Sequence, residues 1–142
     1  MYPRWLSGRN NKGTHLATVI LAGVVLIHIA FVLYTIFIIK ESKYKRATPG
    51  VVGFITVAVL FDISATSAMM IGTEKQYFTT HGILGYTALC LMILDAIYIW
   101  KHRLRHGSSV PFSDVLNRNS KLAYALWLAA FSTGEIIAFM KV

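Results

Sequence analysis

The sequence predicts an all-α integral membrane protein, a bundle of four transmembrane helices. Hydrophobic residues make up 56% of the 142 residues and charged residues only 14%, whereas soluble domains carry about 25% charged residues. The mean hydropathy is +0.58, and four stretches reach the roughly 20 apolar residues that a spanning helix needs. This composition excludes a disordered chain and argues against a soluble enzyme.

The four spans follow one another with little chain between them, apart from one longer connection. The predicted spans are 16–39, 50–72, 77–100 and 122–140. The connection 101–121 contains glycine, serine, proline and asparagine residues that are typical of turns. We expect a single domain over 16–142.

Residues 1–15 are polar and contain one proline and two glycines, so we expect them to form an N-terminal tail. The apolar run that follows has no cleavage site of the A-x-A type. We therefore expect the first span to be retained rather than removed with a signal peptide.

The basic residues predict the orientation of the bundle. Four of them lie in the 39–50 connection and five in 101–121, so nine of the 14 Lys and Arg residues lie on one side. The positive-inside rule places that side in the cytoplasm and both termini outside it. We interpret the net charge of +8 as a topology signal that also favours anionic lipid headgroups, and we expect no nucleic acid partner.

Each predicted span contains an ionisable side chain, which is costly in hydrocarbon and therefore suggests a function. These residues are His28, Asp62, His81, Asp95 and Glu135. His28 and Asp62 lie at matching depths near mid-membrane, so we expect them to pair. Two interpretations stay open, a hydrogen-bonded pair that fixes helix register and a proton relay that includes Asp95 and Glu135.

Small residues indicate where helices approach each other closely. Ser64, Ala68 and Gly72 repeat at intervals of four on the second span, and Gly82 and Gly85 lie at the start of the third. Small residues at helical spacing are typical of transmembrane helix contacts. We expect these positions to pack against neighbouring helices.

A b-type haem needs two histidines at one depth on facing helices. His15 and His81 both lie near the outer surface and are the candidate ligands, with haem b the candidate cofactor. His28 lies roughly 13 Å deeper than His81 at the helical rise of about 1.5 Å per residue. The alternatives are an interfacial residue for His15 and a carbonyl-bonded residue for His81.

Motifs for catalysis are missing from the sequence, which has no nucleophile elbow, Walker A loop or zinc-protease helix. Cys90 is the one cysteine, so neither an internal disulfide nor covalent c-type haem attachment can form. His102 and His106 have a metal-compatible spacing but stand among lysine and arginine residues whose charge opposes a cation. We expect neither a metal site nor enzymatic activity.

From about residue 31 to 140 the chain resembles the HsmA-type small four-helix membrane proteins and, more distantly, cytochrome b561 bundles. The positions that carry the resemblance are Leu33-Tyr34-Thr35, Phe61-Asp62, Thr66, His81-Gly82, Gly85-Tyr86, Leu91-Met92, Trp127 and Gly134. The resemblance implies a four-helix membrane fold and says little about activity.

The chain departs from the pattern of that family at several positions. Val51, Asp95 and Asn117 stand where relatives carry histidines, and Glu135 replaces an apolar residue. If those histidines bind haem or a metal in relatives, this chain lacks that site. The resemblance then leaves His81 as the one candidate ligand that carries over.

Three functions are consistent with these observations. The leading hypothesis is a non-catalytic or redox-associated accessory subunit of a respiratory or photosynthetic membrane complex, with other membrane subunits or copies of itself as partners. The second is a b-type haem electron carrier that uses His81 and His15. The third is a proton- or cation-coupled membrane protein that uses the ionisable residues inside the spans.

Overall fold

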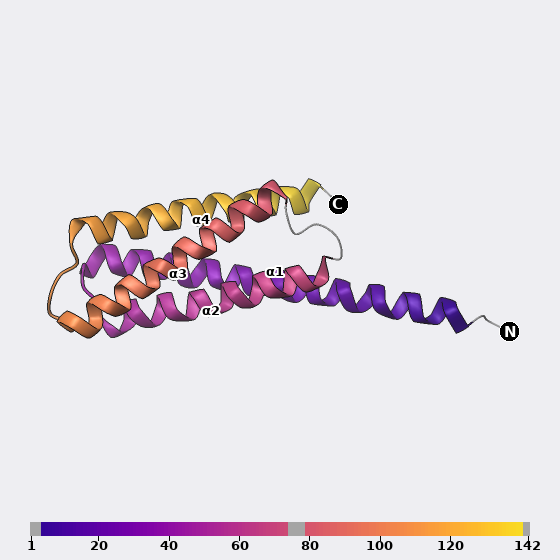
Figure 1. The fold of residues 1–142 in the computed structure, drawn as a ribbon, viewed down its shortest axis with the longest axis horizontal. Helices are drawn as coiled ribbons and strands as arrows, with labels where there is room; N and C mark the ends of the chain where they lie inside the picture. The colour runs from indigo at the N-terminus through magenta and orange to yellow at the C-terminus, as the bar shows by residue number, and fades with distance from the viewer. Residues whose placement is uncertain (1–3, 74–78, 141–142) are drawn as a thin grey trace.

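The computed structural model describes residues 4–73 and 79–140, with side chains from Lys12 onward. Within these residues the fold is all-α (Figure 1), as predicted, and the helices form a four-helix bundle. They are α1 (Arg4–Tyr44), α2 (Pro49–Gly72), α3 (Thr80–His106) and α4 (Asp114–Met140). Each is long and apolar enough to cross a membrane, which makes this an integral membrane protein.

The helices extend beyond the apolar stretches from which they were predicted. α1 has 41 residues, a length of about 60 Å, and begins at Arg4 within the stretch expected to be a tail. α4 begins at Asp114, inside the connection predicted over 101–121. Hydropathy marks only the part of a helix that lies in lipid, whereas backbone hydrogen bonds continue the helix into polar sequence.

Local capping residues set several of the helix ends. The hydroxyl of Thr48 accepts a hydrogen bond from the Val51 amide at 3.3 Å ahead of α2, and Thr79 accepts one from the Gly82 amide at 3.0 Å ahead of α3. These are the roles that N-cap residues play. Gly107 ends α3 with a φ of 69°, a conformation that glycine adopts without a steric penalty.

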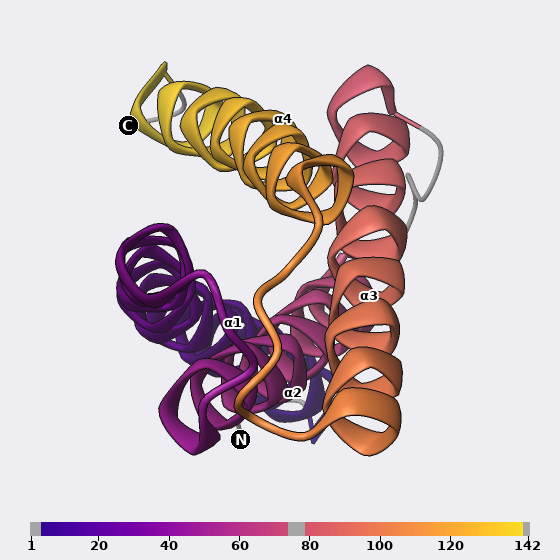
Figure 2. The ribbon, with the colours of Figure 1, turned by 90° about the vertical axis from the view of Figure 1, so that its left-hand side faces the viewer.

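The helices pack in the order α1–α2–α3–α4, seen from one end in Figure 2. α1 runs along α2, and α3 crosses α2 and pairs with α4. Within the described residues the backbones of α1 and α3 do not approach each other closely, and those of α1 and α4 do so at few positions. Aromatic side chains occupy the space between α1 and α4, among them Phe31, Trp127 and Phe131.

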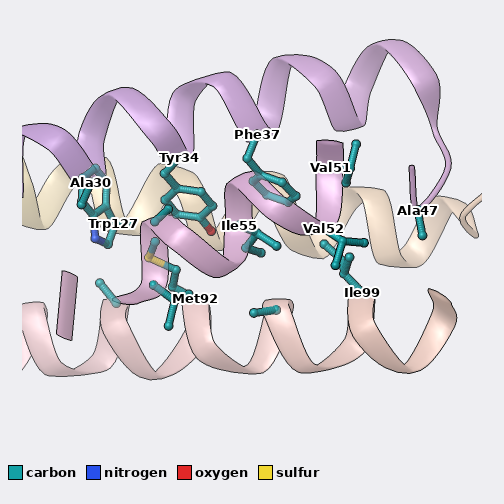
Figure 3. Packing of buried hydrophobic residues seen from close by; sticks show 14 of the residues in the cluster. Ala30, Tyr34, Phe37, Ala47, Val51, Val52, Ile55, Met92, Ile99 and Trp127 are labelled. Atoms are coloured by element: carbon teal, nitrogen blue, oxygen red, sulfur yellow. The ribbon is translucent and has the colours of Figure 1, made fainter. Parts of the chain in front are cut away.

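The core follows one seam of α1. Gly23, Ala30, Tyr34, Phe37 and Glu41 are all buried and recur at intervals of three, four or seven residues, which places them on one helix face. Figure 3 shows the side chains of this seam that meet those of α2, α3 and α4, including Tyr34, Phe37, Ile55, Met92 and Trp127. The seam aligns the other three helices along α1.

α1 and α2 approach most closely at glycines. A Cβ atom added to Gly23 would lie 3.2 Å from the Ala65 carbonyl oxygen and 3.4 Å from the Ala68 Cβ, and one added to Gly72 would clash with Ile20. Ala68 and Gly72 thus lie at the helix contact that their spacing predicts. Ser64 instead is exposed and donates to the Leu60 carbonyl.

Gly85 does not lie at a close helix contact. A Cβ atom added there would meet nothing within 4 Å in the described part of the chain, contrary to the expectation. Gly82 contributes its amide to the Thr79 cap.

The connections at one end of the bundle are joined to each other. The Phe112 amide donates to the Lys45 carbonyl at 2.7 Å, and the Arg103 guanidinium donates to the Ala47 carbonyl at 2.7 Å. These bonds link the α1–α2 connection to α3 and to the α3–α4 connection. They fasten the two helical hairpins together at this end.

The two glycines give a matched test of this packing. We expect Gly23→Leu to destabilise the protein by about 1–3 kcal/mol, because the added side chain forces α1 away from the α2 backbone. Gly85→Leu serves as the control, because open space surrounds that position. Thermal unfolding in detergent micelles measures both, and equal midpoints would contradict the packing described above.

Candidate functional site: polar side chains inside the bundle

Asp62 is buried on α2 at 3% exposure. Its Oδ2 atom accepts a hydrogen bond from the indole Nε1 of Trp127 on α4 at 2.7 Å. A hydrogen bond to a charged or acidic group in the interior contributes about 1.5–3 kcal/mol. The expected pair between His28 and Asp62 is therefore wrong, because Asp62 is directed at α4 across the core.

His28 instead lies beside Glu135 of α4. The His28 Nε2 and Glu135 Oε1 atoms are 3.7 Å apart, and both side chains are about half exposed. His28 Nδ1 is 2.8 Å from the Val24 carbonyl oxygen of the preceding turn. His28 does not belong to the buried seam of α1, so its side chain is directed at α4 rather than at α2. The direction expected for the His28 side chain is therefore wrong, and the depth expected for the two residues stays a prediction.

Asp95 is buried on α3 at 5% exposure. Its Oδ1 atom accepts a hydrogen bond of 2.6 Å from the hydroxyl of Ser120 on α4. The Oδ2 atom has no hydrogen-bond partner among the described residues. The carboxyl group of Asp95 therefore keeps one free oxygen inside the bundle.

Glu41 lies near this pair, at the end of the buried seam next to the α1–α2 connection. The side chain is fully buried, and neither carboxyl oxygen has a hydrogen-bond partner within the described residues. Ser120 lies next to it, and Asp95 and Lys121 act on it electrostatically. Ser120 thus stands between two buried carboxyl groups that come from α1 and α3.

Tyr34 lies in the same part of the core as Glu41, Asp95 and Asp62. Its hydroxyl is buried without a hydrogen-bond partner in the described part of the chain. The ring of Tyr34 packs edge-on against Trp127 at 5.6 Å between centroids. The polar line, defined here as Asp62, Trp127, Tyr34, Asp95, Ser120 and Glu41, therefore runs through the core.

Unpartnered oxygen atoms distinguish this interior from an ordinary helix-packing core. Those found among the described residues are Tyr34 Oη, both Oε atoms of Glu41, Asp95 Oδ2 and Asn117 Oδ1. Buried polar groups are nearly always hydrogen-bonded to protein or water, and a water needs about two to four polar partners. Five such oxygens contributed by α1, α3 and α4 form an environment that can bind water or a proton.

The two candidate haem ligands are not brought together. His15 is exposed on α1. It precedes Ile20, which lies beside Gly72, the last residue of α2. His81 lies on α3, whose backbone does not approach α1 closely in the described part of the chain, and its Nδ1 is 3.1 Å from the Thr133 hydroxyl. Its ring also lies against Gly134. These residues do not fit a haem held between His15 and His81.

A metal centre has no support among the described residues either. They contain no group of three or more His, Cys, Asp or Glu side chains that could hold an ion. His102 Nε2 lies 3.2 Å from the Val110 carbonyl oxygen near the end of α3. This contact is compatible with a structural rather than a metal-binding role for the His102 and His106 pair.

Sequence reasoning missed Glu41, Tyr34 and Ser120. Glu41 lies just past the end of the first span predicted by hydropathy, so it was not counted among the intramembrane acids. The signal that identifies it is its spacing, because Glu41 continues the seam of Tyr34 and Phe37 at intervals of three and four residues. Whether an acid continues a buried seam is therefore a stronger indicator of burial than how far it lies from the apolar stretch.

Comparison with models of protein families, with curated proteins and with solved structures finds no match to this chain.

A tryptophan pair tests the hydrogen bond to Asp62. We expect Trp127→Phe to destabilise the protein by about 2–4 kcal/mol, because it leaves a buried carboxyl group without its donor and opens space in the core. Trp100→Phe is the control, because the indole of Trp100 donates to Thr56 at an exposed position. Unfolding in detergent should show less than about 1 kcal/mol for it.

The Asp62→Leu background separates the hydrogen bond from the loss of volume. There, Trp127→Phe should cost less than in the native chain, because no acid is left unpaired. Equal costs in the two backgrounds would contradict a role for the bond.

Proposed function

We propose that this chain is a proton- or cation-coupled membrane protein in which the polar line binds and passes the ion. The observation that carries the proposal is Glu41, a fully buried acid with two unpartnered oxygens within the described residues. Ionisable side chains inside membrane bundles are costly and mark ion pathways and proton relays. Here two such acids lie on either side of a single hydroxyl group.

The chemistry of the groups favours a proton over a metal ion. Two buried carboxyl groups in the same low-dielectric interior cannot both carry a charge without a large energetic cost. Ser120 already donates to Asp95, and a hydroxyl can accept as well as donate. Ser120 can therefore pass a proton between Glu41 and Asp95 by accepting one proton and giving up another.

The order of the groups along the bundle suggests a route. Glu41 lies three residues before the end of α1, Tyr34 lies about two turns deeper, and Asp62 lies at the middle of α2. We propose that the Glu41 end faces the cytoplasm, because nine of the 14 basic residues flank that side. Protons would then enter or leave at Glu41, with Asp62 at mid-membrane.

The resemblance to the HsmA-type family remains a proposal. Tyr34, Asp62 and Trp127 are three of the positions on which it depends, and Trp127 contacts both of the others. These contacts support the idea that such positions work as one unit.

An accessory subunit of a respiratory or photosynthetic complex is the second candidate. It is favoured by the ionisable His28 and Glu135 side chains, which are about half exposed within the helices α1 and α4. Polar side chains at membrane depth normally face protein or water rather than lipid. Purification in mild detergent tests this candidate, since it requires that other membrane proteins co-purify in fixed proportion.

Proton flux tests the first candidate. Purified full-length protein is reconstituted into liposomes that contain a pH-sensitive dye, and a potassium diffusion potential drives uptake. We expect flux above that of empty liposomes, and we expect Glu41→Gln and Asp95→Asn each to reduce it at least tenfold, on the order of the effect of removing a proton-transfer group. The replacements keep the shape of each side chain, so the fold should persist.

Asp114→Asn is the matched control for these variants. Asp114 is an exposed acid in the first turn of α4, so its loss should leave the flux unchanged. Native protein with no flux above empty liposomes, or equal flux in all three variants, would rule out the proposed relay. A flux that follows sodium rather than pH would assign the line to a metal cation.

A further inference from the structure

The α1–α4 side of the bundle, defined here as the outer surface of α1 together with Glu135 of α4, is exposed in the single chain. α1 and α4 contact each other beneath it through aromatic side chains, among which Phe31 and Phe131 stack at 4.9 Å between centroids. Outside this contact α1 presents a shallow hollow lined by Val24, Val25, His28, Ile29, Val32 and Leu33. An apolar surface alone is what lipid covers, so the polar members of this side carry the argument.

His28 and Glu135 are those polar members. Their side chains are 48% and 46% exposed, with Nε2 and Oε1 3.7 Å apart. His28 lies at the midpoint of the candidate span Lys12–Tyr44, so the pair faces outward at mid-membrane depth. At 3.7 Å the contact is too long for a good hydrogen bond, and half of each side chain remains available to a partner.

The α1 residues around His28 have the spacing of a helix-pairing surface. Leu21, Val25, His28 and Val32 follow one another at intervals of four, three and four, and Leu21, Val25 and Val32 are each more than half exposed. Such a repeat of about 3.5 residues lets two helices pack along a shared seam. A polar residue at one position of the seam fixes the register of the two helices.

We propose that a second copy of this chain packs on the α1–α4 side, about a twofold axis along the membrane normal, with His28 of each copy facing Glu135 of the other. The side carries both a group that can bear positive charge and one that can bear negative charge, so it is complementary to itself. A twofold axis along the membrane normal sets every residue at the depth of its own counterpart. The second copy therefore presents Glu135 at the depth of His28 without further adjustment.

Site-specific cross-linking tests the contact. In a Cys90→Ser background, Val25→Cys is reconstituted at high dilution in lipid and treated with a thiol cross-linker. We expect covalent dimers from Val25→Cys. The native chain is the control, because Cys90 is exposed on α3, whose backbone does not approach α1 closely within the described residues, and its cross-linking should stay at background.

The charged pair is tested by dimer dissociation in lipid. We expect Glu135→Gln to weaken the dimer about eightfold, since polar contacts between membrane helices contribute on average roughly 0.6 kcal/mol each and the twofold axis doubles the number lost. Asp62→Asn removes a buried intramembrane acid that does not face this side, and should leave dissociation unchanged. A charge-reversed double variant, His28→Glu with Glu135→His, should restore the dimer.

Three results would overturn the proposal. They are a monomer at every dilution, cross-links through Cys90 but not through Val25→Cys, and dissociation that is unaffected by Glu135→Gln. Thermal unfolding of each variant shows whether the monomer is intact. Because none of these measurements depends on ion flux, a failure here leaves the proposed relay untouched, and a failure of the relay leaves the dimer untouched.

Discussion

The high cost of exposing a polar group to hydrocarbon is the constraint on which this structure depends. Inside a bilayer, polar groups must find partners within the protein. Threonine and serine hydroxyls on the outer faces satisfy this requirement by donating to carbonyls four residues earlier, as Thr18, Ser64 and Thr87 do. Asp62 meets it across the core through Trp127. Against this background, the oxygens of Glu41 and Asp95 that lack partners among the described residues stand out as the place where the constraint is relaxed.

α1 has one buried side and one exposed side, and the bundle is arranged around this difference. The seam from Gly23 to Glu41 is buried against α2 and the rest of the core, and it ends in the acid of the proposed relay. The side that contains His28 is open. One helix therefore connects the interior chemistry to the outer surface, and both proposals made for this chain use residues of the same element.

The sequence was sufficient to predict the architecture, because four long apolar stretches have few alternatives to four membrane-spanning helices. It was less informative about partners. His28 and Asp62 do lie within helices as expected, but an expected depth does not determine the direction of a side chain, and α4 supplied the partner of each. Glu41 was missed because hydropathy measures average polarity along the chain and takes no account of which face a residue occupies. Ser120 was beyond prediction, since it matters only through the contact of α4 with Asp95.

The hydrogen bonds that join the two connections have a mechanical consequence. Lys45 bonds to Phe112 and Arg103 to Ala47 at one end of the bundle, while farther along α1 and α4 meet through side chains, as Phe31 with Phe131 and His28 with Glu135 do. The two helical hairpins are thus fastened to each other at the end where their connections lie. A rotation of one hairpin about this end would displace atoms in proportion to their distance from it. His28 and Glu135 would then move far while Glu41 stayed almost still. Glu41, the acid nearest the joined end, would thus keep its position while the outer groups move relative to it.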